Sequence, residues 1–175
     1  MQNKILIVYY SRKGENYWNG EIKNLAKGNT EAAAEIIAEA TGGRLFEVET
    51  VKPYPADYYA CTEAAKKELR DNARPELKSF VENMDGYSDI FVGYPNWWGT
   101  MPMAMFAFLG RYDMSGKRIM PFCTNEGSGM GNSERDLKKL CPGAKVERGL
   151  AIHGAEVSSS RAKIEEWLKS LGEAR

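Results

Sequence analysis

The chain has 175 residues, with 24 Lys and Arg, 24 Asp and Glu, one His and three Cys. This length fits one domain that can bury most of its apolar surface, and 43% hydrophobic with 27% charged residues is typical of a globular protein. The net charge of zero excludes the strongly basic surface of a general nucleic-acid-binding protein, so we expect no nucleic-acid partner.

The three cysteines, Cys61, Cys123 and Cys141, are odd in number and widely spaced. This spacing disfavours a disulfide framework or a zinc site and favours a reducing compartment. The first apolar run, residues 5–10, is too short for a signal-peptide core or a membrane span, and no later run is long enough. We therefore expect a cytoplasmic protein with no membrane partner.

Five short runs predict strands. Residues 5–10 are continuously apolar and rich in β-branched and aromatic types, as in a strand buried on both faces. Residues 45–51 alternate over their middle, which indicates a less buried edge strand, and residues 146–152 are expected at the other edge. Pro121 cannot donate to a ladder and weakens one assignment. The runs are residues 5–10, 45–51, 90–94, 119–123 and 146–152.

Helical patterns lie between these runs. Thr30 is expected to cap the first helix, Pro102 to occupy the first position of the third, and Ser133 with Asp136 to form a capping box for the fourth. Alternation of strands and helices without a linker predicts an α/β fold, a single doubly wound domain over residues 1–175 with a five-stranded parallel sheet. The expected helices are 31–40, 57–72, 102–110, one from 133 stopped by 142–143, and one from about 160.

The first strand-to-helix connection is unusually long. Almost twenty residues separate Tyr10 from Thr30, where a compact turn needs only a few. Asn19-Gly20 between aromatic and β-branched residues is a strong signal for a type I′ hairpin. We expect a hairpin inserted over about residues 14–27.

Removing this insert would leave Ser-Arg-Lys-Gly-Asn-Thr leading into the first helix. Small hydroxyl residues, a glycine and a helix N-terminus together suit a phosphate, because amides and hydroxyls donate to its oxygens. The alternative is that Thr30 only caps the helix and Ser11 only starts a turn. Neither GxxxxGK[ST] nor GxGxxG occurs, which argues against a nucleotide P-loop or a dinucleotide fingerprint.

Two later loops follow buried strands and would lie at the same sheet edge, where ligands bind in open parallel sheets. Residues 94–102 place Trp97 and Trp98 on a loop, which favours stacking against a flat ligand over packing into the core beneath. Residues 124–131 contain three glycines, so the backbone can approach a planar ligand; a mobile loop without a ligand is the alternative.

Together these three loops resemble those of the flavodoxin family of small FMN proteins, over nearly the whole chain. Flavodoxins are themselves the established example of FMN bound at the switch point of a sheet with strand order 2-1-3-4-5, so this order and placement follow from the resemblance. It implies that FMN is the cofactor, with Ser11, Arg12, Gly28, Asn29 and Thr30 on the phosphate, Pro95, Asn96, Trp97, Trp98 and Gly99 on the ring, and Thr124, Asn125, Glu126, Gly127 and Gly129 along its other edge.

Three features depart from the family pattern. The hairpin splits the phosphate loop, which could reposition Ser11 or add contacts from Asn16, Tyr17 or Trp18. The third loop lacks the aromatic residue that covers one flavin face in many electron carriers. Those carriers are usually acidic, whereas this chain is neutral.

The remaining candidates are assigned to structure. His153 follows the last strand, where a role near the flavin is possible but a structural role is favoured. Met101, Met103 and Met105 are expected to pack the third helix, and Cys123 to lie in the core. No residue is assigned as catalytic, and no metal-ligand cluster stands out.

The leading interpretation is an FMN-binding flavodoxin-type redox protein that mediates electron transfer between redox partner proteins. The alternative is an NAD(P)H-dependent FMN reductase of quinones or similar small acceptors, so the sequence leaves open whether the protein is a carrier or an oxidoreductase. The missing aromatic and zero charge favour the reductase, and the short single-domain form favours the carrier. A flavin-free phosphate-binding or interaction module is the third, less favoured interpretation.

Overall fold

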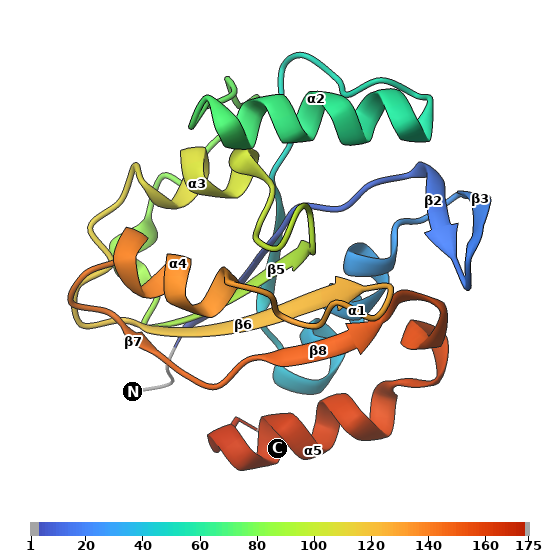
Figure 1. Cartoon of the computed structure of the whole chain (residues 1–175). Helices are drawn as coiled ribbons and strands as arrows, with labels where there is room; N and C mark the ends of the chain where they lie inside the picture. The colour runs from blue at the N-terminus through green and yellow to red at the C-terminus, as the bar shows by residue number, and fades with distance from the viewer. Residues whose placement is uncertain (1–3, 174–175) are drawn as a thin grey trace.

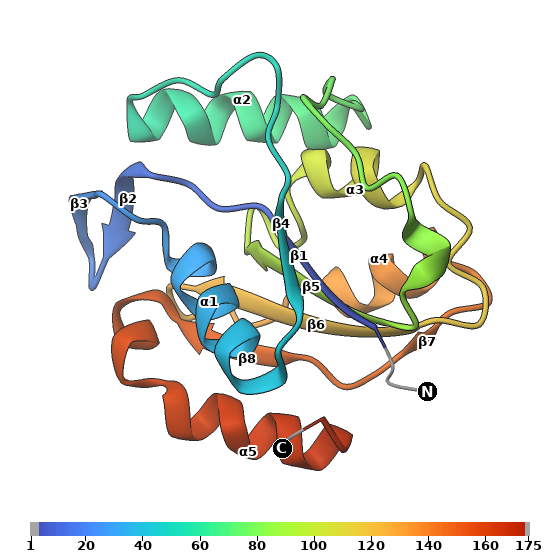
Figure 2. The same cartoon turned by 180° about the vertical axis from the view of Figure 1, so that it is seen from behind.

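A computed structural model describes residues 4–173. A central sheet is covered by α1 and α5 on one face and by α3 and α4 on the other, with α2 packed against α3 (Figures 1 and 2). The elements are β1 Ile5–Tyr9, β2 Gly14–Trp18, β3 Glu21–Leu25, α1 Asn29–Thr41, β4 Arg44–Glu47, α2 Tyr58–Arg70, η1 Met84–Gly86, β5 Asp89–Pro95, α3 Met103–Leu109, β6 Arg118–Asn125, α4 Ser133–Leu140, β7 Lys145–Val146, β8 Leu150–His153, η2 Gly154–Ser159 and α5 Arg161–Leu171.

The main sheet is parallel, in the order β4-β1-β5-β6, with β7 and β8 both pairing with β6 at the fifth position. This confirms the predicted order 2-1-3-4-5 and both predicted edges. Successive side chains of β1 enter different cores: Leu6 and Val8 pack toward α3 and α4, whereas Ile7 and Tyr9 pack toward α1 and α5. Burial on both faces explains why this strand is continuously apolar.

The prediction of one continuous fifth strand over residues 146–152 is wrong, because the structure divides it into β7 and β8. The physical reason is Pro121 in the neighbouring strand β6. The backbone of Ile119 faces β7, since its carbonyl accepts from the Glu147 amide at 2.8 Å, and residues two apart face the same side. Pro121 therefore faces the neighbouring strand with no N–H to donate. The register shifts from Ile119↔Val146 to Phe122↔Leu150, so one extra residue bulges where the proline lies.

The hairpin is present as predicted. Strands β2 and β3 form their own two-stranded antiparallel sheet, and Asn19 and Gly20 at its turn both have positive φ, 51° and 85°, as a type I′ turn requires. Figure 1 shows this hairpin beyond the ends toward which the arrows of β5, β6 and β8 point, beside the start of α2. The insert therefore stands at the sheet edge where ligands bind in this fold class.

Three predicted helix starts are wrong in detail. Gly28, not Thr30, is the N-cap of α1, because the Oγ of Ser11 reaches in from another segment and accepts the Glu31 amide at 3.0 Å. Pro102 is the N-cap of α3 rather than its first residue. Ser133 begins α4 but forms no capping box, because its hydroxyl donates to the Met130 carbonyl.

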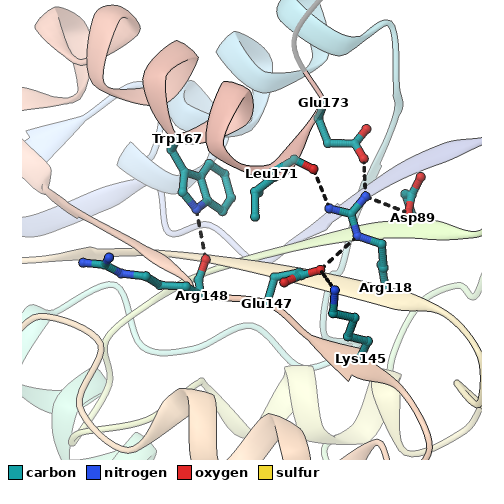
Figure 3. Close-up of polar contacts among 8 residues, drawn as sticks. All are labelled: Asp89, Arg118, Lys145, Glu147, Arg148, Trp167, Leu171 and Glu173. Atoms are coloured by element: carbon teal, nitrogen blue, oxygen red, sulfur yellow. Dashed lines mark hydrogen bonds and ion pairs between the residues drawn. The ribbon is translucent and has the colours of Figure 1, made fainter.

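At the opposite end of the sheet, one arginine fastens the C-terminal helix (Figure 3). The guanidinium of Arg118 donates to Glu147 at 3.1 Å, to Glu173 at 2.6 Å and to the Leu171 carbonyl at 2.7 Å. It also lies 3.6 Å from Asp89, whose side chain is only 3% exposed. Arg118 therefore neutralises carboxylates from β5, from the β7–β8 connection and from the chain after α5.

Candidate functional site

A cavity of about 550 Å³ opens where β5 and β6 end. Its walls come from the loop after β1, the first residue of α1, the hairpin, the first turns of α2, the loops after β5 and β6, and the residue after β8. The lining residues are Arg12, Asn16, Tyr17, Asn29, Tyr58, Tyr59, Cys61, Thr62, Glu63, Ala65, Pro95, Asn96, Trp97, Trp98, Thr124, Asn125, Glu126, Ser128 and Gly154.

The first turn of α1 is packed tightly against the loop after β1. A Cβ on Gly28 would overlap the Oγ of Ser11 and lie 2.7 Å from the carbonyl oxygen of Arg12. The buried Thr30 hydroxyl hydrogen-bonds the Thr124 hydroxyl at 2.8 Å, which joins α1 to the end of β6. Only glycine at position 28 lets the backbone amides of this turn come so close to the β1 loop.

Arg12 lines the cavity but also has a structural task. Its Nε donates to the Glu15 carbonyl at 2.9 Å, and its Nη2 donates to the carbonyls of Pro55 and Ala56, both at 3.0 Å. The guanidinium thus ties the base of the hairpin to the segment before α2. It is the one cationic side chain among the described residues of the lining.

The two tryptophans are held in different ways. The Trp97 ring meets the edges of Tyr10 and Tyr54, at 5.2 and 5.1 Å between centroids, so it is half core and half cavity wall. Trp98 is 49% exposed, and its Nε1 donates to the Thr62 carbonyl at 2.8 Å. One indole thus packs partly into the core, and both line the cavity, where stacking on a flat ligand stays a prediction.

The backbone of this loop is a tight turn. Trp97 and Thr100 exchange backbone hydrogen bonds, and the central residues Trp98 and Gly99 both have positive φ, 55° and 85°. A non-glycine residue in this conformation is strained, which is compensated here by the Asn96 side chain. Asn96 accepts from the Gly99 amide at 2.9 Å and donates to the Gly129 carbonyl at 2.9 Å, so it links the second and third loops.

The third loop is connected to the hairpin. The carboxylate of Glu126 accepts from the Asn19 amide at the hairpin turn, at 3.2 Å, and lies 3.4 Å from Nε2 of His153. The Nδ1 of His153 is buried and has no hydrogen-bond partner among the residues described. His153 is therefore beside the site, and among the described residues only its Nε2 approaches a polar partner.

Structure and sequence agree on part of the site. Most of the residues implied by the resemblance, among them Arg12, Asn29 and Pro95, line the cavity. Tyr58 and Tyr59, at the start of α2, were missed; an adjacent tyrosine pair at a predicted helix start was the available signal. Those lining the cavity are Arg12, Asn29, Pro95, Asn96, Trp97, Trp98, Thr124, Asn125 and Glu126, and those shaping the loops behind it are Ser11, Gly28, Thr30, Gly99, Gly127 and Gly129.

Buried thiols and methionines lie where the sequence placed them. Cys123 is fully buried in the core, and burial raises the pKa of its thiol to about 12. Met103 and Met105 are buried within α3, and Met101 is buried just before its start. Over residues 4–173, no cluster of His, Cys, Asp and Glu could hold a metal ion, and no helix is long and apolar enough to cross a membrane.

The flavodoxin family model matches residues 23–171. The chain belongs to the flavodoxin family. This match confirms the resemblance carried by the three loops, and membership supports FMN as the cofactor of this flavodoxin. No functionally curated protein matches the chain.

Solved structures agree with this assignment. A protein from Bacteroides uniformis, provisionally named a flavoprotein, is 30% identical, with a TM-score of 0.77 and coverage of 95% of this chain and 98% of that one. A similarly named protein from Bacteroides eggerthii is 29% identical, with a TM-score of 0.74 and coverage of 98% and 99%. A flavoprotein from Lactobacillus acidophilus, solved in complex with FMN, is 24% identical with a TM-score of 0.64 and coverage of 90% and 97%, and it shows the shared fold.

The residues of the cavity fit FMN. The volume of the cavity lies within the range of roughly 300–1,000 Å³ that is typical of small-molecule binding sites. The start of α1 contributes Asn29 to the cavity lining. The amides of Asn29 and Thr30 have no acceptors within the helix and can donate to an anion, whereas the Glu31 amide already donates to the Oγ of Ser11. Indole and phenol rings from three segments line the remainder and suit a flat aromatic ring system.

Cys61 gives an independent way to detect a ligand in this cavity. It lines the cavity but is only 3% exposed, and burial raises the pKa of its thiol. We expect iodoacetamide to label Cys61 slowly in the folded protein at mildly alkaline pH, and saturating FMN to slow this labelling further. Mass spectrometry of tryptic peptides measures both rates, and Cys61→Ala identifies the signal. Equal labelling with and without FMN would contradict the placement of the ligand.

Proposed function

We propose that this protein is an FMN-binding redox protein that mediates electron transfer, as flavodoxins do. The observation that carries the proposal is the cavity, in which an amide-rich helix start and an aromatic wall meet at the ends of β5 and β6. When bound, FMN supplies the electron chemistry, and the protein supplies binding, orientation and electrostatics. Three free, buried cysteines favour a reducing cytoplasm as the place of action.

Each loop has a separate task in this proposal. The α1 start, with Gly28 and Asn29, binds the phosphate through backbone amides. Trp97 and Trp98 orient the ring, because their turn is fixed by Asn96 and by the bond from Trp98 to Thr62. Low polarity around the ring disfavours negative charge there, so these aromatic contacts tune the reduction potential.

The reductase remains the second candidate, and one observation favours it. The cavity extends along α2 to Glu63 and Ala65, beyond the three loops expected to hold the cofactor, which leaves space for a small acceptor. The charges of the cavity lining, however, disfavour the binding of NAD(P)H, which this reductase would need. The lining carries the carboxylates of Glu63 and Glu126, and Arg12 already donates to three carbonyls, so a dinucleotide diphosphate meets little compensation.

Two measurements test the proposal. Titration of the purified protein with FMN should change the flavin visible spectrum and quench Trp fluorescence; no change in either would refute FMN binding. Rapid anaerobic mixing of the FMN complex with NADH or NADPH should leave the visible absorbance of the flavin unchanged on the millisecond scale. Rapid bleaching by either nucleotide would establish the reductase in place of the carrier.

A further inference from the structure

The inserted hairpin contributes Asn16 and Tyr17 to the lining of the cavity. Glu15 and Tyr17 alternate with Asn16 along β2, and both contact the start of α2. The Glu15 carboxylate accepts from the Tyr58 amide at 2.6 Å, and the Tyr17 ring meets the Tyr58 ring edge to face, with centroids 4.8 Å apart. The hairpin is therefore docked on α2 through one charged and one aromatic contact.

A row of three phenol rings results. Tyr58 continues to Tyr59, with centroids 5.5 Å apart, and all three tyrosines line the cavity. Tyr59 is 57% exposed, and Tyr17 lies close enough to raise the pKa of its hydroxyl by hydrogen bonding. We call Tyr17, Tyr58 and Tyr59 the tyrosine wall.

Part of the tyrosine wall is exposed, because Tyr59 makes an edge-to-face contact with Tyr58 and still leaves more than half of its surface open to solvent. Pairs of aromatic rings prefer contacts at about 4.5–7 Å, and an exposed ring gains most from a flat partner that also removes it from water. The third loop, residues 124–131, carries no aromatic side chain, so it cannot cover a flat ligand in this way. The tyrosine wall therefore gives the cavity a further aromatic surface, separate from that of Trp97 and Trp98 on the second loop.

We propose that the tyrosine wall covers the ring system of FMN, and that Glu15 is a positioning residue that fixes the wall by docking the hairpin on α2. The inference rests on the proposed function, because it assumes that FMN occupies the cavity. It assigns the insert a role in cofactor binding rather than in phosphate contact alone.

Trp18 provides a matched control on the same strand. Its side chain points to the opposite face of β2 from Tyr17 and does not line the cavity. The Nζ of Lys23 lies 4.2 Å from the centroid of the Trp18 ring. Tyr17→Leu and Trp18→Leu therefore remove one aromatic ring each from opposite faces of β2. Any general loosening of the hairpin should affect both variants alike.

The experiment compares FMN with riboflavin, which has the same ring and no phosphate. Tyr17→Leu and Tyr59→Leu should weaken both ligands by the same factor, about 2- to 12-fold, and should increase the fluorescence of the bound flavin. Trp18→Leu should change neither. Glu15→Ala removes the acceptor of the Tyr58 amide and should act in the same direction as Tyr17→Leu, whereas Glu15→Gln should stay closer to the original protein, because its amide oxygen can still accept that hydrogen bond.

The outcomes separate this inference from the proposed function. If the unaltered protein binds no flavin, the proposed function fails and the inference fails with it. If the unaltered protein binds FMN while the folded tyrosine variants keep their affinities and bound-flavin fluorescence, only the inference is overturned. If Trp18→Leu weakens flavin binding as much as Tyr17→Leu does, the hairpin acts through its overall fold. That result also overturns the proposed role of the tyrosine wall.

Discussion

Gly28→Ala should lower the affinity for FMN by about 5- to 150-fold, the equivalent of the roughly 1–3 kcal/mol that overpacking a close contact costs. The added methyl group meets the Ser11 hydroxyl, which can rotate, and the Arg12 carbonyl at 2.7 Å, which cannot move without the backbone. The β1 loop and the α1 start must therefore separate, and the amides proposed to bind the phosphate lose their alignment.

Riboflavin is the internal control for this variant. Because it carries no phosphate, its affinity should be almost the same for Gly28→Ala as for the original protein. Isothermal titration with both ligands gives the two ratios, and thermal unfolding without ligand shows whether the variant is folded. An equal loss for riboflavin and FMN would mean that Gly28 shapes the ring site instead of the phosphate site.

Arg118→Met should destabilise the fold by about 3 kcal/mol, a typical cost of removing one partner from a buried ion pair. The substitution keeps an unbranched apolar chain but leaves the buried Asp89 carboxylate without its cation, and Asp89 already has one oxygen with no partner among the described residues. It also releases the Glu173 carboxylate and the Leu171 carbonyl, so the end of α5 should loosen first.

Urea unfolding followed by circular dichroism measures this change. Lys145→Met is the matched control, because Lys145 also pairs with Glu147 at 2.8 Å but is 73% exposed; its cost should be below about 0.5 kcal/mol. FMN affinity should be unchanged in both, since the cluster lies at the opposite end of the sheet from the cavity. Equal stabilities for the two variants would show that the Asp89 charge is compensated by another route.

The parts of the fold that could be predicted from the sequence are those determined by residues close together in the chain. Ile5–Tyr9 and Asn19-Gly20 carry strong patterns, a continuous apolar run and a turn that needs two positive φ values, and both appear as predicted. The capping of α1 could not be predicted, because the oxygen that accepts its amide belongs to Ser11, twenty residues earlier. A local rule assigned that task to Thr30, which instead bonds Thr124.

The site shows the same division. The loops after β5 and β6 were found because parallel strands end at a common edge, so Trp97 and Asn125 could be placed from topology. The contribution of α2 was missed because the hairpin determines how its first turn is held. The contact of Glu15 with the Tyr58 amide joins residues 43 positions apart, and no periodicity in either segment indicates it.

The closed base of the hairpin also bears on folding kinetics. Gly14 pairs with Leu25, so the chain leaves the β1 loop and returns to it at nearly the same point. The entropy of closing a loop rises only slowly with its length, and this one can close early through its own turn. The insert therefore lengthens the path from β1 to α1 in sequence while adding little to the search that brings them together.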